Sequence, residues 1–150
     1  MTLEGATIPD ATASDTAAVL ARDAGAASAI TIYVCVTCRA GLPLDLVPIP
    51  GEVLADATAR AAAGTGIAVR RVRCLANCNR GLSAAVRRDG AWTYVFGYLD
   101  TATGAGALIE GARLFAHSPD GLMPWRGRPA ALKRGLVART PPFAFAGEPE

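Results

Sequence analysis

The sequence predicts an α/β protein with a mixed four-stranded sheet flanked by helices. After the N-terminal region, a strand-like segment, a helix-like segment and a second strand-like segment follow one another, which is typical of a strand-helix-strand unit with parallel strands. Further along, Asp89-Gly90 separates two more strand-like runs. An Asp-Gly pair between apolar runs is a strong hairpin signal, so these two strands should be antiparallel neighbours.

The first strand is expected over residues 30–36, a β-branched and aromatic run that is apolar on both faces, as in a central strand. The loop that follows cannot be helical because it is broken by Pro43, Pro48 and Pro50. A helix is then expected over residues 52–63, starting near Gly51, since it contains no breaker and repeats a polar stripe every four residues.

Three more strands are expected over residues 67–73, 82–87 and 92–98, and a second long helix over residues 104–117. The resulting order is strand, helix, strand, strand, strand, helix, which is the thioredoxin-like plan. We therefore expect a flexible N-terminal arm over residues 1–29, a thioredoxin-like metal-binding domain over 30–118 and a C-terminal strap over 119–150. The strap should contain a short helix between Pro129 and Gly135.

The four cysteines form two close pairs, Cys35-Val-Thr-Cys38 and Cys74-Leu-Ala-Asn-Cys78. Each pair lies at the end of one of the two strands that should run in parallel. Because parallel strands end at the same edge of a sheet, the topology predicts that the four sulfurs can meet there. Thiolates suit zinc, copper(I) and iron-sulfur clusters, so the sequence predicts a metal centre at this edge.

The second pair carries a resemblance. The stretch Cys74-Leu-Ala-Asn-Cys78-Asn-Arg-Gly81 resembles the second cysteine motif of thioredoxin-like 2Fe-2S ferredoxins and of the peripheral 2Fe-2S subunit of respiratory NADH dehydrogenase. This resemblance implies that Cys74 and Cys78 ligate a 2Fe-2S cluster, and that Cys35 and Cys38 supply the other two ligands. The first pair is more closely spaced here than in those ferredoxins.

The chain as a whole resembles, over about residues 30–142, a small bacterial family of predicted metal-binding proteins. The residues that carry this resemblance are the Cys-Val-Thr-Cys-Arg motif near the start and the tail segments 124–129 and 133–142. The resemblance implies metal binding without implying a reaction.

Two alternatives to the cluster are open. Structural zinc uses the same four thiolates. However, the second spacing is longer than the usual C-x2-C, and the pairs lie 35 residues apart instead of the ~15–20 residues of a zinc ribbon. A catalytic dithiol at Cys35 and Cys38 would need a helix N-terminus beside it to lower the thiol pKa. The predicted helix starts only about residue 51, so we expect that stabilisation to be absent.

Composition narrows the function further. The chain has 150 residues, 51% of them apolar and 19% charged, and a net charge of +2, which fits one soluble domain. The most apolar stretch, residues 26–36, falls short of the ~20 residues that cross a bilayer, and no signal peptide is apparent. We therefore expect a cytoplasmic protein with no membrane partner. His117 is the one histidine, so no nucleophile-base pair is apparent and no enzymatic activity is predicted.

Six arginines fall within nineteen residues around the second cysteine pair. Of these, Arg71, Arg73 and Arg80 are expected to raise the reduction potential of an anionic cluster and to bind an acidic redox partner. A merely solvated basic face is the alternative. Nucleic acid is an unlikely partner because no binding motif accompanies the arginines. The related ferredoxins pair as dimers, so a homodimer is a further expectation.

Overall fold

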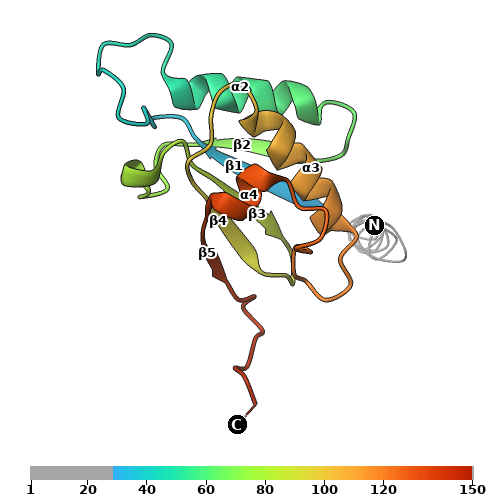
Figure 1. Ribbon diagram of the computed structural model, residues 1–150. Helices are drawn as coiled ribbons and strands as arrows, with labels where there is room; N and C mark the ends of the chain where they lie inside the picture. Colours follow the sequence, from blue (N-terminus) through green and yellow to red (C-terminus); the bar gives the residue numbers. More distant parts are fainter. Residues whose placement is uncertain (1–28, 150) are drawn as a thin grey trace, which may run out of the picture.

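The computed structural model describes residues 29–149 and is an α/β protein with one five-stranded sheet (Figure 1). The strands lie in the order β2-β1-β3-β4-β5. The elements, in chain order, are β1 (Ile30–Cys35), α2 (Pro50–Ala62), β2 (Ala68–Val72), the 3-10 helix η2 (Cys78–Arg80), β3 (Ala84–Arg88), β4 (Thr93–Phe96), α3 (Gly104–Ala116), α4 (Ala130–Arg134) and β5 (Leu136–Thr140).

The expected strand-helix-strand unit is confirmed. β1 lies inside the sheet, parallel to β2 on one side and antiparallel to β3 on the other. Its apolar residues justify that position, since Ile32 and Val34 are fully buried. α2 starts with Pro50 in its first turn, where proline loses no helical hydrogen bond, and Gly64 follows its end with a φ of 78°.

The predicted hairpin is confirmed as well. β3 and β4 pair in antiparallel register, and the Ala91 amide donates to the Arg88 carbonyl across the turn at 3.1 Å. Gly90 has a φ of 74°, a conformation that favours glycine at this turn position.

The core lies between the sheet and the two long helices. α2 and α3 pack against each other and both contact β1. Phe115 of α3 is fully buried with its ring edge on Tyr94 of β4, at 5.4 Å between ring centroids. Burial of one such side chain contributes about 2–3 kcal/mol, so this contact is a substantial anchor of α3 on the sheet.

The strand count differs from the prediction. The short helix expected in the C-terminal strap is present as α4, but the residues after it form β5 and add a fifth strand antiparallel to β4. β5 contributes little apolar burial of its own, because its last three residues are exposed. Its strand character therefore comes from pairing with β4 rather than from a hydrophobic pattern.

The proposed N-terminal arm falls, except for residue 29, outside the described residues, and the division into arm, domain and strap stays a prediction. Within residues 29–149, none of the helices combines the length and the apolar character that crossing a membrane requires.

Candidate metal centre

The two cysteine-bearing loops lie side by side at the carboxyl ends of β1 and β2. Cys35 of β1 is in register with Val72 of β2, so the residues that follow both strands leave the same edge of the sheet. Both loops are at the left of Figure 1. They also touch, because the Cys35 thiol donates to the Arg73 carbonyl at 3.5 Å and the Thr37 hydroxyl donates to the same oxygen. The sheet topology thus brings the two cysteine pairs, which are far apart in the sequence, to the same edge of the sheet.

The N-terminus of α2 rests on the first cysteine loop. The Gly51 amide donates to the Cys38 carbonyl at 2.9 Å. A Cβ atom at Gly51 would lie 2.2 Å from the Cys35 carbonyl oxygen, so only glycine permits this approach. The proline-containing loop of residues 39–49 bulges outward and returns the chain to Cys38, so the start of α2 contacts the backbone of the first cysteine loop. The observed start of α2 at Pro50 agrees with the predicted start near residue 51.

Buried polar side chains anchor the second cysteine loop. The Asn77 amide group donates to the Ser83 hydroxyl at 3.0 Å, and that hydroxyl donates to the Phe96 carbonyl at 3.1 Å. The Ser83 carbonyl in turn accepts from the Cys35 amide at 3.1 Å. Ser83 thus joins β1, β4 and the second loop. The sequence interpretation missed this role, although an asparagine directly before Cys78 was a visible signal.

The four thiols differ in their surroundings. Cys35 and Cys38 are buried, with 4% and 5% of their surface exposed, whereas Cys74 and Cys78 are exposed. Burial raises the pKa of the Cys38 thiol, and the neighbouring thiols of Cys35 and Cys78 add to the effect. Three of the predicted ligands are therefore close to one another.

Over residues 29–149, no three or more His, Cys, Asp or Glu side chains converge on a point where a single metal ion would be held.

A left-handed alanine follows one cysteine of each pair. Ala40 and Ala76 each lie two residues after a cysteine, Cys38 and Cys74, and have φ values of 53° and 56°. A non-glycine residue in this left-handed conformation costs about 1–2 kcal/mol. In return, the Ala76 amide donates to the Cys74 sulfur at 3.1 Å, and the Ala40 amide is among the groups that lower the pKa of Cys38. An amide pointing at sulfur favours the thiolate, which is the form that binds metals.

Gly81 lies in close contact with the Cys38 sulfur. A Cβ atom at Gly81 would lie 2.1 Å from the Cys38 sulfur. Gly81 itself has φ −67° and ψ 158°, a conformation open to any residue, so the need for glycine is steric. The Cys38 sulfur therefore packs directly against the Gly81 backbone, where any side chain would displace it.

The three predicted rim arginines are all exposed, but they are not equivalent. Arg71 forms an ion pair with Asp56 of α2 at 2.7 Å. Arg73 and Arg80 have no carboxylate partner among the described residues. Arg73 directly precedes Cys74 and Arg80 follows Cys78 in η2, so both cations flank the exposed pair.

Exposed apolar side chains surround the same edge. In the loop between Cys38 and α2, Leu44 and Val47 are 84% and 81% exposed. Arg39 braces this loop by donating to the carbonyls of Pro43 and Leu46, at 3.2 and 3.0 Å. By contrast, Trp92 of the hairpin packs against Phe145 at 5.4 Å between ring centroids.

The comparison with known families places the chain. Residues 32–142, which include both cysteine pairs and β5, match the model of a family described as "Protein of unknown function (DUF1636)". The chain belongs to this family. No curated protein matches the DUF1636 chain well enough to count as a relative.

A solved structure shares the fold of this DUF1636 protein. It is a thioredoxin-like [2Fe-2S] ferredoxin from Aquifex aeolicus, with 16% sequence identity and a TM-score of 0.51. The similarity covers 79% of this chain and 100% of the ferredoxin chain. At this identity the likeness confirms the predicted thioredoxin-like α/β fold and extends no further.

Proposed function

We propose that this protein carries one 2Fe-2S cluster on Cys35, Cys38, Cys74 and Cys78 and acts as a one-electron carrier or redox sensor. The observation that carries the proposal is the left-handed alanine in each cysteine loop, since Ala40 and Ala76 direct amides toward cysteine sulfurs. Two loops that each accept a strained alanine in this position are suited to hold anionic sulfur. The four-cysteine donor set and the close packing of the Cys38 sulfur against Gly81 support a thiolate-bound centre.

Structural zinc is the second candidate, because the same alanine amides would favour thiolates for either metal. The cluster is preferred for two reasons. The Cys74 and Cys78 spacing is longer than the usual zinc C-x2-C. The fold is also shared with the thioredoxin-like [2Fe-2S] ferredoxin from Aquifex aeolicus. A 2Fe-2S cluster requires two dithiolate pairs, which would be Cys35 with Cys38 and Cys74 with Cys78.

The exposure of the cysteines suggests how the protein would work. A bound 2Fe-2S cluster would supply a centre that gains and loses one electron. Cys35 and Cys38 would shield it from solvent, while Cys74 and Cys78 lie at the surface. A partner would therefore meet the second cysteine loop, with Leu44 and Val47 as apolar contacts. No substrate chemistry is proposed.

The experiment that tests this function is a reductive titration of protein purified without oxygen. Addition of dithionite should bleach the visible absorption and give an electron paramagnetic resonance signal of about one unpaired electron per chain. Reoxidation should restore the absorption. A protein that neither absorbs in the visible range nor accepts an electron would contradict the proposal.

The exposed arginines should tune the centre and its docking. Replacing Arg73 or Arg80 by glutamine should lower the reduction potential by about 10–40 mV, because an exposed charge interaction is worth ~0.2–1 kcal/mol. Binding to an acidic partner should weaken in the same variants, most at low salt. Arg71 belongs to the same proposed set, although its ion pair with Asp56 already neutralises part of its field.

Arg60 provides the matched control for these variants. It is exposed in the last turn of α2, whose first turn contacts the Cys38 loop, so the length of the helix separates it from the site by more than a Debye length of ~10 Å. Arg60→Gln should leave the potential unchanged. Equal shifts for Arg60→Gln and Arg73→Gln would show that the rim arginines act only through net charge.

A cytoplasmic location, an acidic redox partner and a homodimer remain parts of this proposal. The exposed apolar side chains beside the cysteine loops are compatible with either kind of partner, a redox protein or a second copy of this chain.

A further inference from the structure

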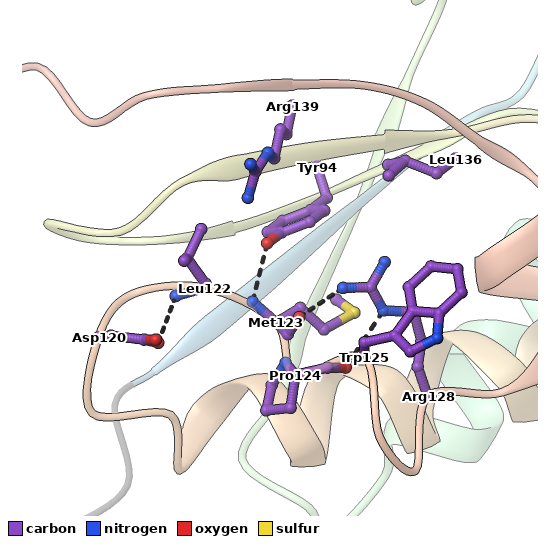
Figure 2. Close-up of a pocket in the computed structure, with 9 residues that line it drawn as sticks. All are labelled: Tyr94, Asp120, Leu122, Met123, Pro124, Trp125, Arg128, Leu136 and Arg139. Carbon is purple, nitrogen blue, oxygen red and sulfur yellow. Dashed lines mark hydrogen bonds between the residues drawn. The ribbon is translucent and has the colours of Figure 1, made fainter. Parts of the chain in front are cut away.

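A second site lies away from the cysteine loops. A cavity of about 480 Å³ opens between β4, β5 and the segment that joins α3 to α4 (Figure 2). None of its lining residues belongs to either cysteine loop. Trp125, Arg128, Leu136 and Arg139 line it, and all four come from the tail segments singled out in the sequence, for which the proposed metal centre provides no role.

Arg128 is a buried cation without an anionic partner. Only 8% of its surface is exposed, and no carboxylate of the described residues lies within ion-pairing distance. Its Nε donates to the Pro124 carbonyl at 3.2 Å and its Nη2 donates to the Met123 carbonyl. These bonds use two of the five guanidinium donors, and the Nη1 group has no hydrogen bond to another residue of the described range 29–149. In Figure 2 the guanidinium stands at the cavity wall.

The position of Arg128 is fixed by its neighbours. Its guanidinium carbon lies 5.5 Å from the centroid of the Tyr94 ring and 5.2 Å from that of the Trp125 ring. Tyr94 is itself held by a 2.9 Å hydrogen bond that its hydroxyl accepts from the Met123 amide. A guanidinium held in this way loses little entropy when it binds a ligand, which is the basis of preorganised recognition.

A second cation faces the same space. Arg139 of β5 lies over the Trp92 ring at 4.6 Å from its centroid and, in Figure 2, points along the face of Tyr94 toward the cavity. Burial lowers the pKa of Arg128, Tyr94 beside it acts in the opposite direction, and the charge of Arg139 lowers the pKa further. Arg128 and Arg139 therefore face the same cavity, and neither forms an ion pair with a carboxylate of the described residues. Such an arrangement carries an electrostatic cost that a bound anion would relieve.

One carboxylate, Asp120, also lines the cavity. It accepts hydrogen bonds from the Ser118 hydroxyl at 2.7 Å and the Leu122 amide at 3.0 Å, and these hold its pKa below the usual range. Asp120 thus stays ionised. Two cations and one anion give the lining a net charge of +1, which suits a monoanion better than a dianion.

We propose that this cavity binds a small organic monocarboxylate, held by Arg128 and Arg139, with its apolar body against Trp125 and Leu136. A planar guanidinium matches a carboxylate with two parallel hydrogen bonds. The aromatic and aliphatic walls provide the apolar contact that a hydrated inorganic anion cannot use. The site is independent of the metal centre.

Calorimetric titration of the full-length protein with sodium benzoate at fixed ionic strength tests the site. Benzamide, the neutral analogue, and inorganic phosphate are the comparison probes. We expect saturable benzoate binding with one site per chain, and binding at least about tenfold weaker for both other probes, since hydrogen bonds between charged groups are stronger than those to a neutral amide. Absent benzoate binding, equal binding of benzamide, or preferred binding of phosphate would each overturn the assignment.

Variants locate the binding. Arg139→Gln should weaken benzoate binding by about tenfold. Arg126→Gln removes the same charge from an exposed position in the loop beside Arg128 but outside the cavity lining, and should change binding by less than about twofold. Equal effects of these two variants would overturn the proposal. Arg128→Lys should also weaken binding; because Arg139 is exposed, Arg139→Gln decides the question even if Arg128→Lys does not fold.

Discussion

Replacing Cys74 or Cys78 by serine should remove the metal centre while leaving the metal-free protein as stable as its parent. Both residues are exposed, and surface substitutions usually change the free energy of unfolding by less than about 0.5 kcal/mol. Loss of a ligand has a much larger effect on the loaded protein, on the order of 4 kcal/mol, because metal binding stabilises the folded chain. Iron analysis and unfolding of each variant, with and without metal, measure both quantities.

The buried pair should behave differently. Cys35→Ser and Cys38→Ser should also abolish metal binding, but each should destabilise the metal-free protein by about 1–3 kcal/mol, since a buried hydroxyl loses its hydration. Asn79→Ser, an exposed change next to Cys78, is the control and should retain full metal content. Full occupancy after any of the four cysteine changes would remove that residue from the ligand set.

The second large effect is expected from Gly81→Ala. The new methyl group would lie 2.1 Å from the Cys38 sulfur, so the thiol must leave its position. We expect metal affinity to fall by about 10- to 100-fold, the usual loss when the immediate surroundings of a ligand are disturbed. A competition titration with a chelator measures this affinity.

Gly106→Ala is the matched control for Gly81→Ala. It makes the same chemical change in α3, where the structure shows open space within 4 Å of the new atom. Metal affinity should be unchanged, and stability should rise by about 0.5–1 kcal/mol because alanine restricts the unfolded chain. Unchanged metal affinity in Gly81→Ala as well would show that the Cys38 sulfur is not a ligand.

The sequence predicted the central part of the fold because its signals are local. The β-branched run of β1, the proline at the start of α2 and the Asp-Gly turn of the hairpin each determine their own element. β5 was missed for the opposite reason. Its residues Leu136–Thr140 show no alternation of apolar and polar side chains, and the strand forms by pairing with β4, a long-range contact that no local sequence pattern indicates.

The candidate site was predictable to the level of its cysteines and no further. Parallel pairing of β1 and β2 was enough to bring both cysteine loops to one edge. The left-handed conformations of Ala40 and Ala76 could not be predicted, because alanine has no preference for them. The contact of Gly51 with Cys35 was also hidden, since it depends on the path of the whole intervening loop.

Quantification of iron, acid-labile sulfide and zinc in protein purified without oxygen tests the central claim most directly. Four thiolates that hold a 2Fe-2S cluster should yield about two iron and two sulfide per chain, with no zinc. One zinc per chain and no sulfide would contradict the account, and would make this protein a zinc-stabilised module rather than an electron carrier.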